Sequence, residues 1–207
     1  MFKSTSKKER RLGIPLFLKP HRSTGPKSAM ARRPQRPGQH GKSRRRAPSE
    51  YSEQLAEKQK FRYTYGLREK QLLNYFKKAS SKSDTTGPAL MSLLERRLDN
   101  VVFRLGFAPS RSVARQVVGH GHIMVGKKKM KVPSYLVKEK DVISVRNESS
   151  GLLLFKELPE SLMDHDAPAW LKVDPKNITG TVVSMPVDLD IPFDISKVVD
   201  YYSKTAK

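Results

Sequence analysis

The sequence contains no cysteine, a single tryptophan and no long apolar run. Without cysteine the chain can form no disulfide, no thiolate metal site and no cysteine nucleophile. No segment approaches the roughly 18 consecutive apolar residues of a membrane span. Basic residues interrupt the N-terminal stretch in which a secretory signal needs an apolar core. We therefore expect neither a membrane partner nor a cysteine-bound metal or cofactor.

Acidic residues are also scarce: 20 Asp and Glu face 41 Lys and Arg, a net charge of +21. Self-repulsion of this size destabilises a fold unless a polyanion neutralises it. Nucleic acid is the polyanion that fits best, because cationic side chains release counterions when they contact its phosphates. An anionic membrane surface is the competing target.

The positive charge is concentrated near the N-terminus. Residues 1–46 carry 15 Lys and Arg against one acid, a net of +14, whereas residues 161–207 carry 5 against 7, a net of −2. The first 46 residues also hold five prolines and few apolar side chains. We expect this stretch to be an extended arm that becomes ordered on RNA, the alternative being a flexible solubilising tail.

Helical patterns dominate the middle of the chain. Ser49 fits an N-cap before a helix over 51–65, which Gly66 can end. A second helix is predicted over 68–79, and a third runs from Pro88 along an apolar stripe to residue 105.

Short strands follow the helices. Ser110 can cap one more short helix, after which strands are predicted at 123–125, 130–132 and 142–145, with a turn at Gly126. Residues 181–183 suggest another strand, and residues 198–202 a last turn or two of helix. These patterns predict an α+β fold.

The start of the helix after Ser110 is suited to bind an anion. Its free N–H groups and the Ser110 hydroxyl can meet a phosphate. Arg111 and Arg115 are four residues apart, so a helix places them on one side. Three consecutive lysines, residues 127–129, lie on the following turn and strand. We expect these residues to form one basic face.

Several stretches of this sequence are similar to a known family. The stretch RLDNVVFRLGFAPSRSVARQ at 97–116, followed by HGHIMV at 120–125 and PSY at 133–135, resembles the RNA-binding module named after small-subunit ribosomal protein S4. The module alone also occurs in pseudouridine synthases and tyrosyl-tRNA synthetases. The flanks, including PGQHG at 37–41 and WLKVD at 170–174, resemble the ribosomal protein family itself, in its bacterial or organellar form.

The resemblance implies a helical domain with an inserted module of two helices packed on a twisted antiparallel sheet, preceded by an extended basic arm. The predicted segments are 1–46 for the arm, 47–94 for the first part of the helical domain, 95–160 for the module, and 161–207 for a C-terminal part that packs back on the helical domain. Members of the family often bind zinc through N-terminal cysteines, which this chain lacks.

The resemblance also implies a structural, non-enzymatic role. Such proteins bind the 5′ domain of small-subunit (16S-type) rRNA, nucleate assembly of the subunit body, and contact neighbouring small-subunit proteins. They also lie near the channel by which mRNA reaches the ribosome and affect translational accuracy. The expected location is the ribosome, in the cytoplasm or in an organelle.

Duplex RNA hides its base edges, so recognition should rest on phosphates and 2′-hydroxyls. The residues that we expect to contact RNA are Gln39, His40, Arg44, Arg45, Arg46, Lys58, Lys60, Arg62, Tyr65, Arg68, Arg96, Arg104, Ser110, Arg111, Arg115, His120, Lys127, Lys128 and Lys129.

Two other functions are known for proteins that contain the module. An RNA-modifying enzyme or tRNA ligase would need a catalytic domain of roughly 150 residues beside the module, for which little chain remains. A free module protein that rescues stalled ribosomal particles would be shorter. The five histidines share no metal-ligand spacing with acids, and no nucleotide-binding glycine loop or catalytic triad can be nominated.

Overall fold

The computed structural model of the chain describes residues 5–19, 25–26, 28–43, 47–81, 85–187 and 192–205. Its contacts divide the chain into two compact units. Unit 1 comprises Met1–Leu90 with Asp190–Lys207, and unit 2 comprises Met91–Leu189. The division falls inside helix α6 (Thr86–Glu95), so one continuous helix belongs to both units.

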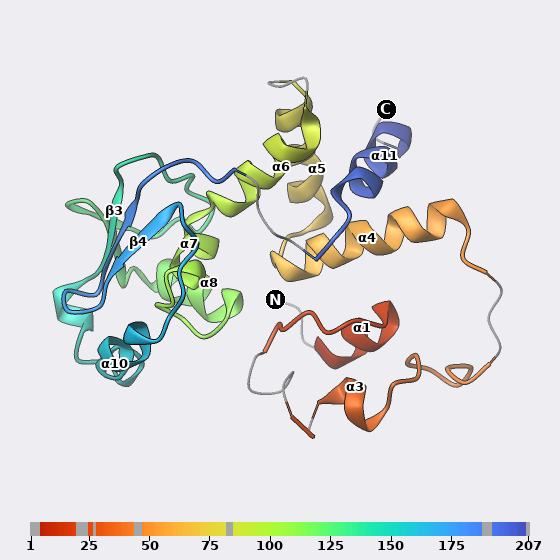
Figure 1. Cartoon of the computed structure of the whole chain (residues 1–207), viewed down its shortest axis with the longest axis horizontal. Helices are drawn as coiled ribbons and strands as arrows, with labels where there is room; N and C mark the ends of the chain where they lie inside the picture. The colour runs from red at the N-terminus through yellow and green to blue at the C-terminus, as the bar shows by residue number, and fades with distance from the viewer. Residues whose placement is uncertain are drawn as a thin grey trace. The chain divides into compact units, whose positions relative to one another are not determined.

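Unit 1 is helical. Its main helices are α4 (Glu50–Thr64), α5 (Glu69–Ser80), the first half of α6, and α11 (Ile195–Thr205). The C-terminal helix α11 packs against α4 and α5 (Figure 1), although more than a hundred residues separate them in the sequence. The rings of Phe76 and Tyr202 lie 5.1 Å apart in the core between α5 and α11. Burial of such aromatic pairs holds the last helix in place.

The predicted start of α4 is confirmed. The Ser49 hydroxyl accepts a hydrogen bond from the Ser52 amide at 3.4 Å, which satisfies one of the free amides of the first turn. The chain leaves the helix through Gly66, whose φ of 63° is a conformation that glycine adopts without strain.

The N-terminal arm is partly folded, which differs from the expectation of an extended segment. Helix α1 (Thr5–Leu12) contacts both α3 (Ala29–Arg32) and α4. Leu16 is buried, and its amide donates to the carboxylate of Glu9 at 3.3 Å. A few apolar side chains and one local hydrogen bond are enough to fold part of the arm once α4 offers a surface to pack on.

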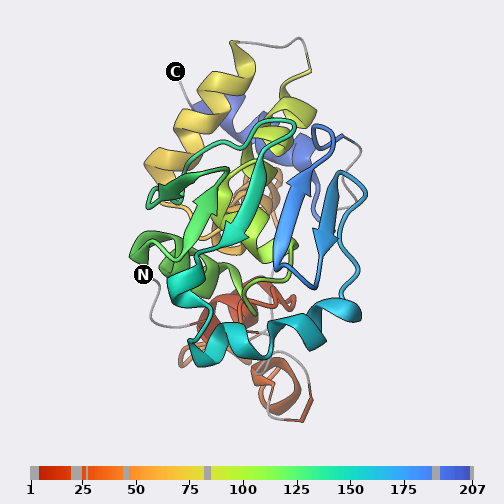
Figure 2. The same cartoon turned by 90° about the vertical axis from the view of Figure 1, so that its left-hand side faces the viewer.

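Unit 2 combines short helices with a five-stranded sheet of order β2-β1-β3-β5-β4, in which all neighbours are antiparallel. Figure 2 shows the strands side by side. Its elements are α7 (Leu98–Arg104), α8 (Arg111–His120), β1 (Ile123–Val125), β2 (Lys128–Met130), β3 (Val142–Val145), the 3-10 turn η1 (Asn147–Ser149), α9 (Leu153–Lys156), α10 (Leu158–Met163), β4 (Leu171–Asp174) and β5 (Thr179–Val182). A single apolar core joins α7, α8, α9 and α10 to the sheet. The predicted α+β class is confirmed.

The predicted third helix is broken in the structure. Helix α6 ends at Glu95, and α7 starts at Leu98. The break occurs because the chain at 133–137 pairs with this segment. The Leu98 amide donates to the Tyr135 carbonyl at 2.8 Å, and Arg97 forms an isolated antiparallel β-bridge with Leu136. The helical apolar spacing continues across the break, so the sequence pattern alone could not reveal it.

The predicted packing of residues 161–207 is wrong for most of that segment. Strands β4 and β5 form a hairpin that joins the sheet of unit 2 through pairing of β5 with β3, and only the last helix packs in unit 1. An exposed sheet edge can pair with any strand of suitable register. Each of these two strands has only four residues. Such short strands give too weak a pattern to choose a partner from the sequence.

No helix in the described part of the chain combines the length and apolar character that a membrane crossing requires.

Candidate nucleic-acid interface

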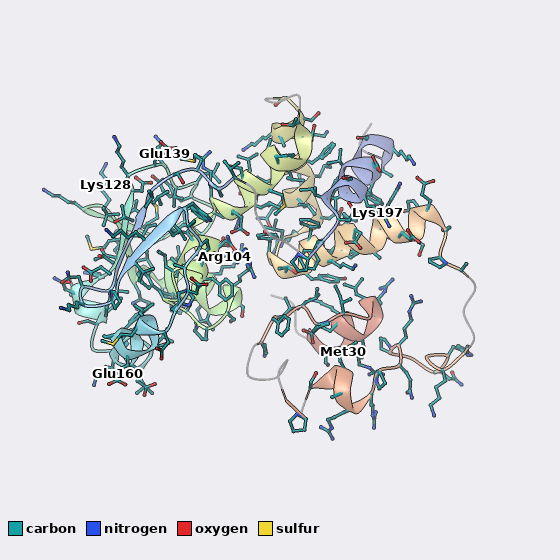
Figure 3. The ribbon with its side chains drawn as sticks, in the orientation of Figure 1. Met30, Arg104, Lys128, Glu139, Glu160 and Lys197 are labelled. Atoms are coloured by element: carbon teal, nitrogen blue, oxygen red, sulfur yellow. The ribbon has the colours of Figure 1, made fainter. Side chains whose placement is uncertain are left out.

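The β1–β2 hairpin presents exposed cations. Register pairs Val125 with Lys128, which leaves Gly126 and Lys127 as a two-residue turn, and Gly126 has a φ of 58°. The three predicted lysines at 127–129 are exposed, and no ion pair among the described residues involves them. Figure 3 shows Lys128 extending from the sheet into solvent. Exposed, unneutralised lysines on a rigid hairpin are suited to contact phosphates.

The end of α8 lies against the same hairpin. Gly121 caps α8 with a φ of 78°, and a Cβ there would lie 2.4 Å from Lys129 Cε. The stem of this lysine therefore crosses the helix end beside Gly121, where the positive φ favours glycine. Burial lowers the pKa of His122, and the nearby charges of His120, Lys129 and Arg146 lower it further. The cations Lys129 and Arg146 near this ring give the hairpin side of unit 2 a positive charge that would attract an anion.

The start of α8 differs from the predicted phosphate clamp. The Ser110 hydroxyl is buried and accepts the Val113 amide at 3.4 Å, so the N-cap itself is confirmed. Arg111 donates from Nε to Asn100 Oδ1 at 2.7 Å, and its guanidinium lies 4.5 Å from the Phe103 ring centroid. This arginine is thus held against α7, where it fixes the angle between the two helices.

Arg115 is the second arginine of this pair. Its Nη1 lies 3.6 Å from Asp99 Oδ2, and 42% of its side chain is exposed. The two arginines therefore contact two neighbouring residues of α7 and do not converge on one free point. Arg115 keeps enough exposed surface to meet a phosphate as well.

A buried polar network lies under this helix pair, and the sequence reasoning missed it. The Glu95 carboxylate, fully buried, accepts from Asn100 Nδ2 at 2.7 Å and from both Nε and Nη2 of Arg104 at 3.0 Å. Arg97, 1% exposed, forms a two-pronged pair with Asp99 at 3.0 and 2.7 Å. Paired and hydrogen-bonded in this way, the charges can be buried.

Two predicted contact residues belong to this interior or its margin. Arg104 is 28% exposed and is engaged by Glu95, and Arg96 donates from Nε to the Val137 carbonyl at 3.0 Å. Their first role is to hold α6, α7 and the 133–137 segment together. The signal that could have revealed this was an acid, Glu95, between the apolar positions Leu94 and Leu98.

In unit 1 two of the predicted contacts are buried. Lys58, 3% exposed, places Nζ 2.8 Å from Glu69 Oε1, and Tyr65 is 5% exposed, so it has no free face on which a base could stack. Both are removed from the candidate interface. Glu69 also accepts from Arg62 at 3.0 Å and from the Tyr202 hydroxyl at 2.8 Å, so it joins α4, α5 and α11. The sequence pattern did not predict this role of Glu69.

The remaining predicted residues of unit 1 are exposed, partly buried or outside the described residues. Lys60 pairs with Glu57 at 2.5 Å, and Gln39, His40 and Arg68 are exposed. The predicted contacts Arg44, Arg45 and Arg46 lie outside the described residues.

A second positive region surrounds Tyr63 on α4. The Lys8 ammonium lies 4.7 Å from the Tyr63 ring centroid, and the Arg62 guanidinium lies 5.2 Å from it. Burial, with the Arg62 charge as a lesser cause, lowers the pKa of Lys8 to about 8. Because the Lys8 ammonium is buried and Arg62 is paired with Glu69, this cluster packs α1 on α4 and is not part of the candidate interface.

Metal ligation has no support in the described ranges, where no three His, Asp or Glu side chains come close enough together to hold an ion.

Two known family models match consecutive segments of this chain. Residues 2–95 match the family model described as the ribosomal protein S4/S9 N-terminal domain, and residues 96–143 match the model of the S4 domain. The boundary between the two matches coincides with the break between α6 and α7.

Curated relatives match over nearly the whole chain. The small ribosomal subunit protein uS4 of Syntrophomonas wolfei is 47% identical over 197 residues, 94% of each chain. The proteins of the same name from Thermus thermophilus and Chlorobium phaeovibrioides are each 45% identical, over 94% and 97% of each chain respectively. This chain belongs to the ribosomal protein S4 family.

Proposed function

We propose that this protein is a structural component of the small ribosomal subunit that binds its rRNA. The observation that carries the proposal is the set of exposed lysines at 127–129 on a rigid hairpin, in a chain of net charge +21. Family membership supports the same role, because the relatives are named small ribosomal subunit proteins.

The finer parts of the proposal follow the family. The RNA partner is the 5′ domain of 16S-type rRNA, where binding nucleates assembly of the subunit body. Neighbouring small-subunit proteins and mRNA near its entrance channel are further partners, and contact with them affects accuracy. The location is the ribosome, and no catalytic role is proposed.

The recognition mechanism is readout of shape and phosphates. The hairpin lysines are exposed cations, His120 is exposed at the end of α8, and Arg115 adds an exposed guanidinium at the α7–α8 pair. The deep groove of A-form RNA hides base edges from side chains. A rigid set of cations therefore selects the spacing of phosphates and not the sequence.

Unit 1 adds contacts of its own to the proposal: Gln39, His40 and Arg68, which are exposed, and Arg44, Arg45 and Arg46, which lie outside the described residues. Lys60 and Arg62 are only partly exposed, and they pair with Glu57 and Glu69. Arg111, Arg104, Arg96 and Ser110 support the interface indirectly, because their polar atoms are engaged within unit 2.

The test is the salt dependence of binding to a 5′-domain rRNA fragment. Replacing all three hairpin lysines by glutamate should weaken binding by about 10- to 1000-fold at moderate salt and reduce the salt slope by about 2 to 3, because up to three phosphate contacts are lost. The matched control is Lys156→Glu, another exposed lysine of unit 2 that lies outside the proposed interface. An unchanged slope in the triple variant would remove the hairpin from the interface.

The structural role and an enzymatic role are separated by a second measurement. A structural component stays with small subunits through a high-salt wash and sediments with them. An RNA-modifying enzyme or tRNA ligase would be released by the wash and would act on free RNA.

A further inference from the structure

One face of unit 2 is apolar and acidic, unlike the basic remainder of the chain. It is formed by α9, α10 and the residues directly next to them, and we call it the α9–α10 face. Its members are Leu152, Leu153, Glu157, Glu160, Met163 and Asp164. Leu153 is 76% exposed, Met163 70% and Leu152 45%. Three of the nine large exposed apolar side chains among the described residues thus fall within twelve residues, on or beside two consecutive short helices.

These apolar side chains are not needed for the core. The same two helices already bury Phe155, Leu158 and Leu162 against the sheet. With 100° per residue, Glu160 and Met163 lie on the side of α10 opposite Leu158 and Leu162. The outer face is therefore a separate surface, with its own composition.

The charge of this surface excludes RNA as its partner. Residues 152–166 contain one cation, Lys156, and four acids, a net of −3 in a chain of +21. The four carboxylates, on Glu157, Glu160, Asp164 and Asp166, are exposed, and no ion pair among the described residues involves any of them. Phosphates would be repelled here, so a surface that RNA cannot cover stays available for something else.

The geometry points to a docking surface for a basic protein. We infer that the α9–α10 face receives a segment of another protein that carries lysine or arginine side chains around an apolar anchor. The anchor would pack on Leu153 and Met163, and the cations would pair with Glu157, Glu160 and Asp164. Such an apolar centre with a charged rim is the usual anatomy of a protein interface. A second copy of this chain is a poor occupant, because two bodies of charge +21 repel each other.

The α9–α10 face lies apart from the lysines that we propose to contact RNA. Figure 3 shows Glu160 on α10 and Lys128 on β2 well apart within unit 2. One side of the unit can therefore contact RNA while the other meets a protein. The inference rests on the proposed function to the extent that the basic partner is met in the assembled small subunit.

The experiment uses the full chain in purified small subunits. A photoreactive benzoylphenylalanine replaces Met163, and irradiation should attach it to a protein peptide rich in lysine or arginine. Adding Glu157→Lys and Glu160→Lys to the same chain should lower the yield of this adduct about tenfold, because two exposed ion pairs become two repulsive contacts. The matched control is Glu139→Lys, another exposed acid of unit 2 outside the α9–α10 face, which should leave the yield unchanged.

Each other outcome overturns the inference. An adduct to rRNA, an adduct to this same chain, no adduct at all, or a yield that the charge reversal does not change would each show that no basic protein docks here. A benzoylphenylalanine in place of Lys128 keeps the two proposals apart. Attachment of that probe to rRNA supports the proposed function whatever happens at Met163, and absence of the chain from small subunits would refute the proposed function itself.

Discussion

The two units of this molecule hold their charges in different ways. In unit 2, Arg97 and Glu95 are fully or almost fully buried and are paired through several hydrogen bonds. In unit 1, the central acceptor Glu69 keeps 44% of its side chain exposed while it joins α4, α5 and α11. The contrast shows that some arginines of a basic protein stabilise its own fold and do not contact a ligand. In this chain, cations that look like RNA contacts in the sequence divide into interior and surface sets.

The largest effect should come from leaving one buried charge without its partner. Asp99→Ala removes the carboxylate that pairs with Arg97, which stays 1% exposed. We expect a loss of about 3–5 kcal/mol in the free energy of unfolding, because a buried guanidinium that loses its carboxylate costs far more than an exposed one. Urea-induced unfolding followed by circular dichroism measures this loss.

The control for that experiment is an exposed pair of the same unit. Glu148→Ala breaks the pair with Arg146, in which Glu148 is 72% exposed, and should change the free energy of unfolding by less than about 0.5 kcal/mol. Equal effects of the two variants would contradict the distinction between buried and exposed charges.

A second, smaller effect concerns close packing in unit 2. A Cβ at Gly180 on β5 would lie 2.4 Å from Leu105 Cδ2, so Gly180→Ala forces the core to shift. We expect a loss of about 1–3 kcal/mol. Gly119→Ala is the matched control, since nothing lies within 4 Å of the new methyl group and the site is helical. It should stabilise by about 0.5–1 kcal/mol. Thermal unfolding of both variants would show whether the signs are opposite.

Unit 1 should respond more weakly, and in a way that depends on pH. Burial alone would raise the pKa of Glu69, but hydrogen bonds from Lys58, Tyr202 and Arg62 outweigh it and lower that pKa. The carboxylate therefore stabilises fully above its unfolded pKa, about 4.3, and this stabilisation disappears as the pH falls through the lower folded value.

Replacing this carboxylate measures the same effect at neutral pH. Glu69→Gln should cost about 1–2 kcal/mol, a modest value because the group is nearly half exposed. The variant should also lose less stability than the parent between pH 5 and about pH 3. Parallel pH profiles for the two proteins would show that Glu69 is not the group responsible.

The smallest expected effect is a change in titration at the surface of unit 2. The pKa of His122 is lowered by burial and then by His120, Lys129 and Arg146. Bound RNA phosphates would offset these charges, so the pKa of His122 should rise in the complex. NMR titration of the ring protons measures it, with and without a 5′-domain fragment. Lys129→Gln should raise this pKa in the free protein, and no change on RNA binding would place His122 away from phosphates.

Local features of the fold could be predicted from particular residues. Ser49 and Ser110 cap their helices as their neighbours suggest, and Gly126 forms the hairpin turn. These features depend on a few consecutive residues, for which backbone chemistry gives a strong local preference. The break between α6 and α7 could not be predicted, because the pairing partner lies near residue 135 and local apolar spacing is unaffected by it.

Some residues of the candidate interface could be predicted from the sequence, and others could not. Lysines 127–129 could be placed at the surface from the sequence, because a short polar turn leaves no core for them to enter. Lys58 and Tyr65 were misplaced: Lys58 is buried beside Glu69 and the Tyr201 ring of the distant helix α11, and Tyr65 is buried beside Phe61. The acidic, apolar surface of α9 and α10 also required the structure, because only three-dimensional packing shows which leucines are left outside.

By itself the sequence determined the α+β class, the excess of positive charge and the family, because composition and short motifs carry that information. Tertiary structure decided which cations are interior, where the helix breaks, and which sheet the strands at 171–182 join. The physical reason is that burial and strand pairing are long-range: each depends on residues far apart in the chain, and the free energy of a charge depends on whether that packing removes it from water.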